Sequence, residues 1–186
     1  ILDVENINSE MAYNFTDKHK PDLILVSGTR LIKEKMFGIN PKIGILNLHT
    51  GLSPYIKGGP NCTNWCLANK EFHLIGNTIT WIDKGIDTGN ILTTEFTTFN
   101  GNETLSELHV KVMEHAHDLY INAVGYLATG KKQSIPQSDI TNGITYYTKQ
   151  WSLKRKIDLI KNYSKLKKEC TNGNLMAKRR DIKTIK

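Results

Sequence analysis

The sequence predicts an α/β fold built on a Rossmann-like, mainly parallel sheet. Short continuous apolar runs, typical of strands covered on both faces, alternate with helical patterns over the first 130 residues. The chain has 186 residues, 39% of them hydrophobic and 23% charged, which suits one folded domain with a small appendage. No apolar run approaches the roughly 20 residues of a membrane span, and acidic residues stand where a signal peptide needs positive charge. We therefore expect a soluble, cytoplasmic protein.

The first half of this pattern is a helix, a strand, a short helix and a second strand. Ser9 or Asn8 is a suitable N-cap for the first helix, which Pro21 must end because proline cannot continue a helix. Residues 22–27 and 42–48 are the apolar runs that predict buried strands, with a short helix over about residues 33–37 between them. Ligands of open α/β sheets bind at the carboxyl ends of strands, so the residues that follow these runs are candidates for a site.

The second half contains a loop, two further strands and three helices. Residues 50–61 are rich in glycine and proline, and Asn61 is placed to cap a helix over about residues 62–68. The longest helix begins near Asn102 and ends before Gly130, the residue type that commonly follows a helix. The other expected elements are strands over residues 72–82 and 90–96 and a basic amphipathic helix over about residues 153–169.

Three polar side chains on separate segments form the candidate catalytic set. Asn47 and His49 end the second strand, and two residues of separation put them on one side of it. Asp87 lies in a turn between two glycines. This set can move an acyl group onto an amine: the imidazolium and the amide donate hydrogen bonds to the oxyanion, while the carboxylate orients the ring, favours its charged form and assists proton removal.

Each of these residues also has an ordinary structural interpretation. A histidine at a strand end is often only hydrogen-bonded, an asparagine often forms a turn, and Asp-Thr-Gly between glycines is a common turn sequence. Their joint occurrence around the segment 55–58, in this order, is more informative than any one of them.

Residues 45–58 and 76–92 resemble the two active-site blocks of the N10-formyltetrahydrofolate-dependent formyltransferases, and the resemblance covers about residues 21–129. It implies that Asn47, His49 and Asp87 are catalytic and that N10-formyltetrahydrofolate is the formyl donor. It also implies a folate pocket along residues 27–32 and 81–86, read largely through backbone groups. The candidate folate-binding residues are Gly28, Arg30, Leu31, Trp81, Asp83 and Gly85, and the candidate acceptor-binding residues are Ser53, Tyr55, Lys57 and Gly58.

Two departures from the family pattern accompany this resemblance. Thr80 stands where some family members carry a histidine. Family members also begin with a βα unit and a glycine-rich turn, which several use to hold the phosphate of the acceptor, and nothing before Asp22 matches that unit. We expect that an N-terminal segment is missing from this chain; the alternative is that this half of the site has been lost.

The acceptor implied by the resemblance is the amine of a nucleotide-linked amino sugar. The Ser-Pro-Tyr-x-x-Gly form at residues 53–58 is similar to that of the sugar N-formyltransferases, which act in polysaccharide biosynthesis. Glycinamide ribonucleotide and methionyl-tRNA are the alternative acceptors.

Positive charge is concentrated at the C-terminal end. Residues 1–148 carry a net charge of −3 and residues 149–186 carry +10. We therefore expect a catalytic domain over residues 1–135 and a basic helical extension over residues 136–186. The extension is a solvated helix, or it binds an acidic partner, a membrane surface or nucleic acid; an inactive formyltransferase-like body with a nucleic-acid-binding tail is the competing class. A homodimer is a further expectation.

The three cysteines do not form an evident metal site. Cys62 and Cys66 are four residues apart and share a helix face, and Cys170 is remote from both in sequence. A structural zinc site needs more thiols or imidazoles at regular spacing. We expect three free thiols and no bound metal.

Overall fold

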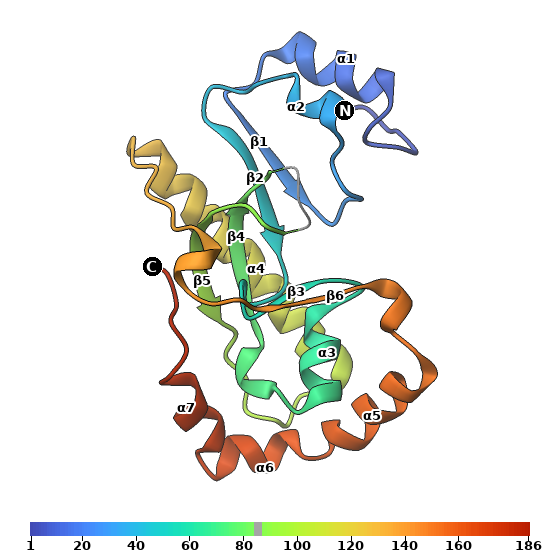
Figure 1. The fold of residues 1–186 in the computed structure, drawn as a ribbon, viewed down its shortest axis with the longest axis vertical. Coiled ribbons are helices and arrows are strands. Elements are labelled where there is room, and N and C mark those ends of the chain that lie inside the picture. Colours follow the sequence, from blue (N-terminus) through green and yellow to red (C-terminus); the bar gives the residue numbers. More distant parts are fainter. Residues whose placement is uncertain (84–86) are drawn as a thin grey trace.

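The computed structural model describes residues 1–83 and 87–186. Its centre is a four-stranded sheet in the order β1-β2-β4-β5, with the long helix α4 packed along one face (Figure 1). The elements of this layer are β1 (Leu23–Ser27), β2 (Gly44–His49), β4 (Gly76–Trp81), β5 (Ile91–Phe96) and α4 (Leu105–Ala128).

The sheet is mixed rather than mainly parallel. Strands β1 and β2 are parallel, as expected for two strands joined through a helix, but β2 pairs antiparallel with β4, and β4 pairs antiparallel with β5. A short connection joins β4 to β5, and parallel neighbours need a crossover of a dozen or more residues. The α/β class is confirmed, and the parallel part of the described sheet is restricted to its first two strands.

The alternation of side chains along β2 separates the core from the site. Leu46 and Leu48 pack with Ile79 under α4, so Asn47 and His49 face the opposite side of the sheet. The hydroxyl of Tyr120 on α4 donates to the carbonyl of Leu46 at 2.8 Å and ties the helix to this strand. One buried face thus fixes the direction of both predicted catalytic side chains of β2.

The N-terminal elements cover the edge of the sheet at β1. Helix α1 (Glu10–His19) begins at the predicted N-cap Ser9, whose side chain accepts from the backbone N–H of Ala12, and α2 (Glu34–Phe37) lies between β1 and β2 in the chain. A small cluster of Val26, Ile32, Met36 and Ile45 joins these elements.

The other end of the molecule is built around α3 (Cys62–Asn69), with the C-terminal helices wrapped beneath it (Figure 1). Leu159, Leu166 and Leu175 are buried in the same cluster as the residues of α3. The elements of this end are β3 (Ile56–Gly58), the 3-10 turns η1 (Phe72–Leu74), η2 (Gln137–Asp139) and η3 (Thr148–Gln150), β6 (Ile144–Tyr146), α5 (Leu153–Tyr163), α6 (Leu166–Thr171) and α7 (Asn174–Arg179).

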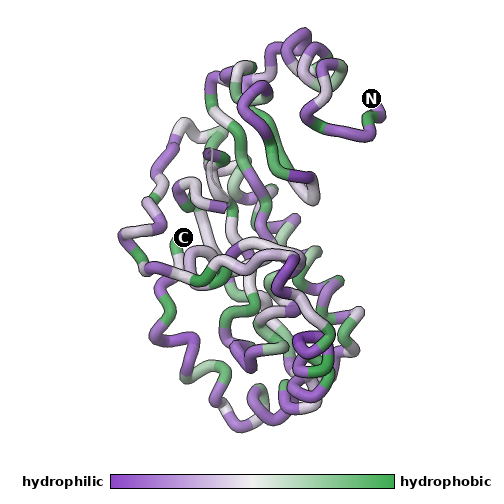
Figure 2. The backbone as a smooth tube through the Cα atoms, turned by 45° about the vertical axis from the view of Figure 1, so that its right-hand side comes forward, coloured by the Kyte–Doolittle hydropathy of each residue, from purple (hydrophilic) through white to green (hydrophobic). Residues whose placement is uncertain are grey.

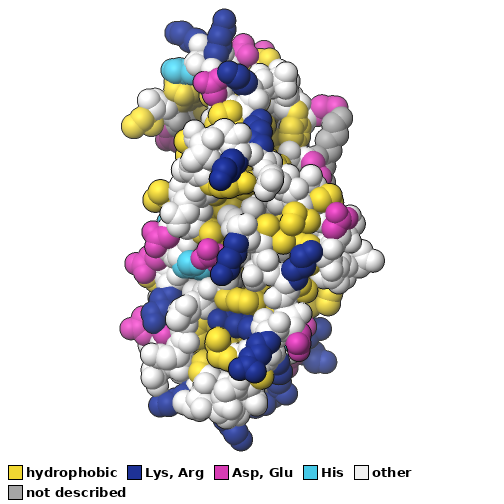
Figure 3. Space-filling model, turned by 90° about the vertical axis from the view of Figure 1, so that its left-hand side faces the viewer, with side chains coloured by type: hydrophobic (Ala, Val, Ile, Leu, Met, Phe, Trp, Pro, Cys, Tyr) yellow, Lys and Arg dark blue, Asp and Glu magenta, His cyan; other side chains and the backbone are white. Residues whose placement is uncertain are grey.

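The extension predicted over residues 136–186 is helical and basic, and it is packed closely against the rest of the chain. Strand β6 pairs in parallel with β3, and Tyr146 stacks on Trp65 with ring centroids 4.1 Å apart. Arg179 donates hydrogen bonds to the carbonyls of Ile75 and Thr97 at 3.0 Å. Hydrophilic and hydrophobic residues alternate along these helices (Figure 2), and lysine and arginine side chains gather at the lower end of the face in Figure 3. The domain boundary near residue 135 remains a prediction.

Two expected elements have different bounds in the structure. The strand predicted over residues 72–82 begins only at Gly76, because residues 72–74 form the turn η1. The helix predicted over residues 153–169 is divided into α5 and α6, and at the break the hydroxyl of Ser164 donates to the carbonyl of Lys161 at 2.9 Å. Such a side-chain bond competes with the helical ladder. The division lets Leu159 and Leu166 both reach the core.

The described residues contain neither a membrane-spanning helix nor a cluster of metal ligands. No described helix is both long and apolar enough to cross a membrane. Within residues 1–83 and 87–186, no three His, Cys, Asp or Glu side chains are grouped as metal ligands. The thiols of Cys62, Cys66 and Cys170 are free.

A buried carboxylate before α4 makes stability depend on pH. Burial opposes ionisation of Glu103, but hydrogen bonds from Lys111 and from the backbone N–H groups of Asn100 and Gly101 outweigh it and lower the pKa to about 2. The folded chain therefore holds this carboxylate ionised at a pH where the unfolded chain protonates it. Its stabilising effect is complete above the ordinary value of 4.5 and is lost as the pH falls toward 2.

We expect Glu103→Gln to lower the free energy of unfolding by about 1–3 kcal/mol at pH 7, measured by urea denaturation. The difference from the wild type should shrink between pH 4.5 and pH 2, because both chains are then uncharged at this position. Glu114→Gln, on an exposed position of α4, is the matched control and should change little. An equal loss at pH 2.5 and pH 7 would contradict this account.

Candidate active site

The structure brings the three predicted catalytic side chains together on one face of the sheet. The amide Nδ2 of Asn47 donates to Oδ1 of Asp87 at 3.4 Å, and Nδ1 of His49 lies 3.5 Å from Oδ2 of the same carboxylate. His49 is 8% exposed, so the imidazole is nearly enclosed. An amide, an imidazole and a carboxylate from segments 40 residues apart therefore form one contact group.

Asp87 is held in an unusual backbone conformation. Its φ of +51° lies in the left-handed region, which residues other than glycine adopt at an energetic cost that functional sites often carry. The N–H of Gly58 donates to Oδ2 of Asp87 at 3.1 Å, so the carboxylate also binds the end of β3. The carboxylate is thereby fixed from two sides, by β2 and by β3.

The second nitrogen of His49 faces α3 rather than Asp87. The Sγ atom of Cys62, the first residue of α3, lies 3.5 Å from Nε2 of His49. Burial raises the pKa of this thiol, and the charge of Asp87 raises it further, so the thiol stays protonated. Both ring nitrogens of His49 therefore have a neighbour, Asp87 at Nδ1 and Cys62 at Nε2.

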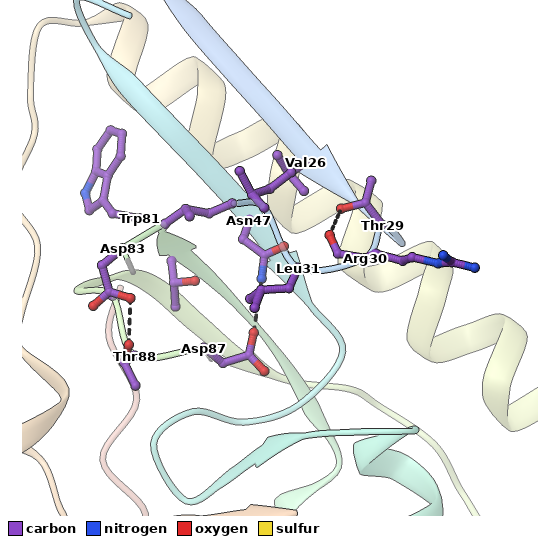
Figure 4. A pocket seen from close by; sticks show the side chains of 13 residues that line it. Val26, Thr29, Arg30, Leu31, Asn47, Trp81, Asp83, Asp87 and Thr88 are labelled. Atoms are coloured by element: carbon purple, nitrogen blue, oxygen red, sulfur yellow. Dashed lines mark hydrogen bonds between the residues drawn. The ribbon is translucent and has the colours of Figure 1, made fainter. Parts of the chain in front are cut away.

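A cavity of about 240 Å³ lies beside this group (Figure 4). Asn47 and Asp87 are part of its wall, and Thr80 of β4, which pairs with Asn47, is another part. Its remaining lining is Val26, Thr29, Arg30, Leu31, Ile32, Trp81, Ile82, Asp83, Thr88 and Gly89. The wall is formed by the carboxyl end of β1, the end of β2 and the segment after β4, which is the place expected for a ligand of an open α/β sheet.

Four of the six residues predicted to bind folate line this cavity. Arg30, Leu31, Trp81 and Asp83 are among the lining residues, whereas Gly28 is not. The side chains of Arg30 and Trp81 point away from the Asn47 and Asp87 pair (Figure 4). Their contribution to the wall is therefore close to the backbone. Gly85 lies outside the described residues.

The residues predicted to bind the acceptor are divided between the site and the interior. Gly58 contacts Asp87 directly, and Lys57 lies beside it on β3, half-buried. Ser53 is 1% exposed, and its backbone N–H donates to the hydroxyl of Thr78. The hydroxyl of Tyr55 accepts from the backbone N–H of Lys183 at 2.8 Å. The hydroxyl of Tyr55 therefore has a structural partner, whereas the hydroxyl of Ser53 is buried without a hydrogen-bond partner among the described residues.

Sequence reasoning did not identify two further neighbours of the catalytic group. Cys62 was expected to be a free thiol, but its contact with His49 depends on how α3 packs against β2. The amide of Gln137, 50 residues beyond Asp87, donates to the carbonyl of Asp87 at 2.7 Å. No local motif surrounds Gln137, so the sequence alone contains no signal for this contact.

Comparisons with known proteins identify the family. Residues 4–124 match the model of the formyl transferase family. The chain belongs to the formyl transferase family. The methionyl-tRNA formyltransferase of Methylacidiphilum infernorum is 31% identical over 150 residues, and that of Clostridium tetani is 34% identical over 128 residues. These matches cover 81% and 69% of the chain, and the chain spans only 45% and 41% of the two relatives.

Solved formyltransferases share the fold. PseJ from Anoxybacillus kamchatkensis, crystallised with UDP-4,6-dideoxy-4-formamido-L-AltNAc and tetrahydrofolate, has a TM-score of 0.63 and 25% identity and covers 81% of this chain and 74% of its own. A sugar N-formyltransferase from Shewanella has a TM-score of 0.66 at 19% identity and covers 84% of this chain and 65% of its own. The predicted formyltransferase-type α/β fold is confirmed.

A methyl group at residue 51 would disturb His49, the histidine that the sequence predicts to be catalytic. A Cβ on Gly51 would lie 2.5 Å from Nε2 of His49 and 2.8 Å from Sγ of Cys62. We expect Gly51→Ala to cost about 1–3 kcal/mol of unfolding free energy, measured in urea, and to shift the imidazole ¹⁵N resonances of His49.

Gly125→Ala is the matched control for this change. Residue 125 lies in α4 and has nothing within 4 Å of the added Cβ. Alanine in this helix should keep or slightly raise stability and leave the His49 resonances unchanged. Unchanged His49 resonances in Gly51→Ala would show that the ring is not confined as described.

Proposed function

We propose that this chain is the folate-dependent part of an N-formyltransferase, which transfers a formyl group from N10-formyltetrahydrofolate to the primary amine of a nucleotide-linked amino sugar. The observation that carries this proposal is the contact group of Asn47, His49 and Asp87, of which Asn47 and Asp87 line a cavity. Family membership supports the reaction class, and it supports the predicted donor.

The cavity suits one ring system of a folate. Its volume of about 240 Å³ is below the roughly 300–1,000 Å³ of pockets that enclose a drug-sized ligand, so a pterin would fit and the remainder of the donor would extend outside. Val26, Leu31 and Ile32 provide apolar wall, and the backbone around Ile82 and Asp83 provides polar groups. This combination of apolar wall and backbone groups fits a flat heterocycle with an amide-like edge.

The donor supplies the formyl carbon, and the residues of this chain stabilise the charge that develops when an amine attacks it. A ring N–H of His49 is one donor to the oxyanion, and the amide of Asn47 is the second donor. Asp87 lies against Nδ1, where it keeps the ring oriented and stabilises the imidazolium. The same carboxylate lines the cavity and can take part in removing the proton that the amine loses.

Two kinds of comparison bear on the identity of the acceptor, and they favour different acceptors. The Ser-Pro-Tyr-x-x-Gly segment and the likeness to PseJ, whose structure holds a UDP-sugar, favour a nucleotide-linked amino sugar. The sequence relatives favour methionyl-tRNA as the second candidate, and the basic C-terminal extension is compatible with RNA. We place the amino sugar first because the segment at residues 53–58 reaches the site itself, where the N–H of Gly58 donates to Asp87.

Replacing any one of the catalytic residues should slow formyl transfer. We expect Asn47→Ala, His49→Ala and Asp87→Ala each to lower the rate by roughly 10²-fold or more with folding retained. The measurement is transfer of a ¹⁴C-formyl group to a UDP-linked amino sugar, with circular dichroism as the folding check. His117→Ala, on an exposed position of α4, is the control. Wild-type rates in all three variants would contradict the mechanism.

The same assay distinguishes the two acceptors. With saturating donor, the amino sugar should be formylated and methionyl-tRNA should not, and the activity should change little between 50 and 200 mM salt. Preferential formylation of the tRNA with a steep fall over this salt range would make the second candidate the correct one.

A further inference from the structure

The side chain of Gln137 reaches the catalytic turn from the C-terminal extension. Its Nε2 donates to the backbone carbonyl of Asp87 at 2.7 Å and to that of Gly89 at 2.8 Å. Gln137 is 7% exposed, so these bonds are protected from water. One amide group thus donates to two backbone carbonyls of the same turn, those of Asp87 and Gly89.

The turn that receives these bonds has little freedom. Asp87 has a φ of +51°, and a Cβ at Gly89 would lie 1.7 Å from the carbonyl oxygen of Trp81. The backbone is therefore tightly packed at Gly89 and in a sparsely populated conformation at Asp87. Such a conformation persists where contacts from other segments hold it, and the hydrogen bonds from the amide of Gln137 are such contacts.

Gln137 is itself fixed by the segment that carries it. Ile135 and Ile91 exchange both backbone hydrogen bonds at 2.9 Å, which anchors the extension at the start of β5. Residue 137 follows two positions later and begins η2. The amide therefore approaches the turn from a strand-like anchor rather than from a loose loop.

The carbonyl oxygen of the Gln137 side chain does not contribute to stability. Its Oε1 is buried and has no hydrogen-bond partner among the described residues. A buried oxygen without a partner is destabilising. The residue thus serves the conformation of the turn at the expense of its own hydrogen bonding, which is typical of groups that support a functional site.

We propose that Gln137 is a positioning residue that holds the peptide of Asp87 so that its carboxylate meets His49 and Asn47. This inference rests on the proposed function of Asp87. It makes the C-terminal extension part of the catalytic apparatus, because residue 137 lies beyond the predicted catalytic domain. The acceptor and donor are not contacted by Gln137 in this proposal; it acts through the turn.

The test uses Gln137→Met, which keeps the length of the side chain and removes both donors. We expect the rate of formyl transfer to fall by about tenfold or more, since small misplacements of catalytic groups are costly, with little change in the KM of the acceptor. Gln137→Asn keeps the donors on a shorter side chain and should fall between the wild type and Gln137→Met. Gln133→Met, an exposed position on the same segment, is the matched control and should retain the wild-type rate.

A double-mutant cycle separates positioning from general stability. In an Asp87→Ala background, Gln137→Met should change the rate by less than about twofold, because the group that it positions is absent. An equal loss in both backgrounds would overturn the proposal, and so would a wild-type rate in Gln137→Met.

Hydrogen exchange at residues 87–91 gives a readout that does not depend on activity. Exchange there should quicken in Gln137→Met and stay unchanged in Gln133→Met. If the wild type formylates no acceptor, the proposed function fails, and this exchange result still decides whether Gln137 holds the turn. Unchanged exchange in Gln137→Met would overturn that contact.

Discussion

The site depends on the interactions that the carboxylate of Asp87 makes. Asn47 and Gly58 donate to its two oxygens, and His49 lies 3.5 Å from one of them. These partners come from β2 and from the end of β3, while the backbone of Asp87 is bonded to the C-terminal extension. Segments that are far apart in the sequence therefore meet at one ionisable group, and a displacement of that group would alter all of them together.

The sheet and α4 provide the rigid frame for this group. Because Leu46 and Leu48 are buried under α4, the side chains between them and after them must project from the opposite face. The antiparallel pairing of β2 and β4 then places Thr80 beside Asn47, and both residues line the cavity together with Asp87. The burial of apolar side chains on one face thus determines where polar chemistry occurs on the other.

Much of the site was predictable because its signals are local. Alternation along a strand placed Asn47 and His49 together, and the order of the motifs linked them to Asp87. The caps Ser9 and Asn61 were also predictable, since a capping side chain bonds to a backbone group three residues away.

The remaining features depend on contacts between distant residues. The pairing of β3 with β6 joins residues 56–58 to residues 144–146, and three-residue strands leave no periodic pattern. The contact of Cys62 with His49 and that of Gln137 with Asp87 arise only when whole elements pack. The break between α5 and α6 follows from the surface that both helices cover, so a pattern of apolar residues alone predicts one continuous helix.

The most direct test of the account is calorimetric titration of this chain with 5-formyltetrahydrofolate. Leu31 lies on the cavity wall with 55% of its surface exposed, so Leu31→Trp obstructs the cavity without disturbing the core, and Leu153→Trp, 72% exposed on α5, is the control. The account predicts saturable binding with one site, weakened about tenfold or more in Leu31→Trp and unchanged in Leu153→Trp. Absence of binding to the folded chain, or equal affinity in both variants, would contradict it.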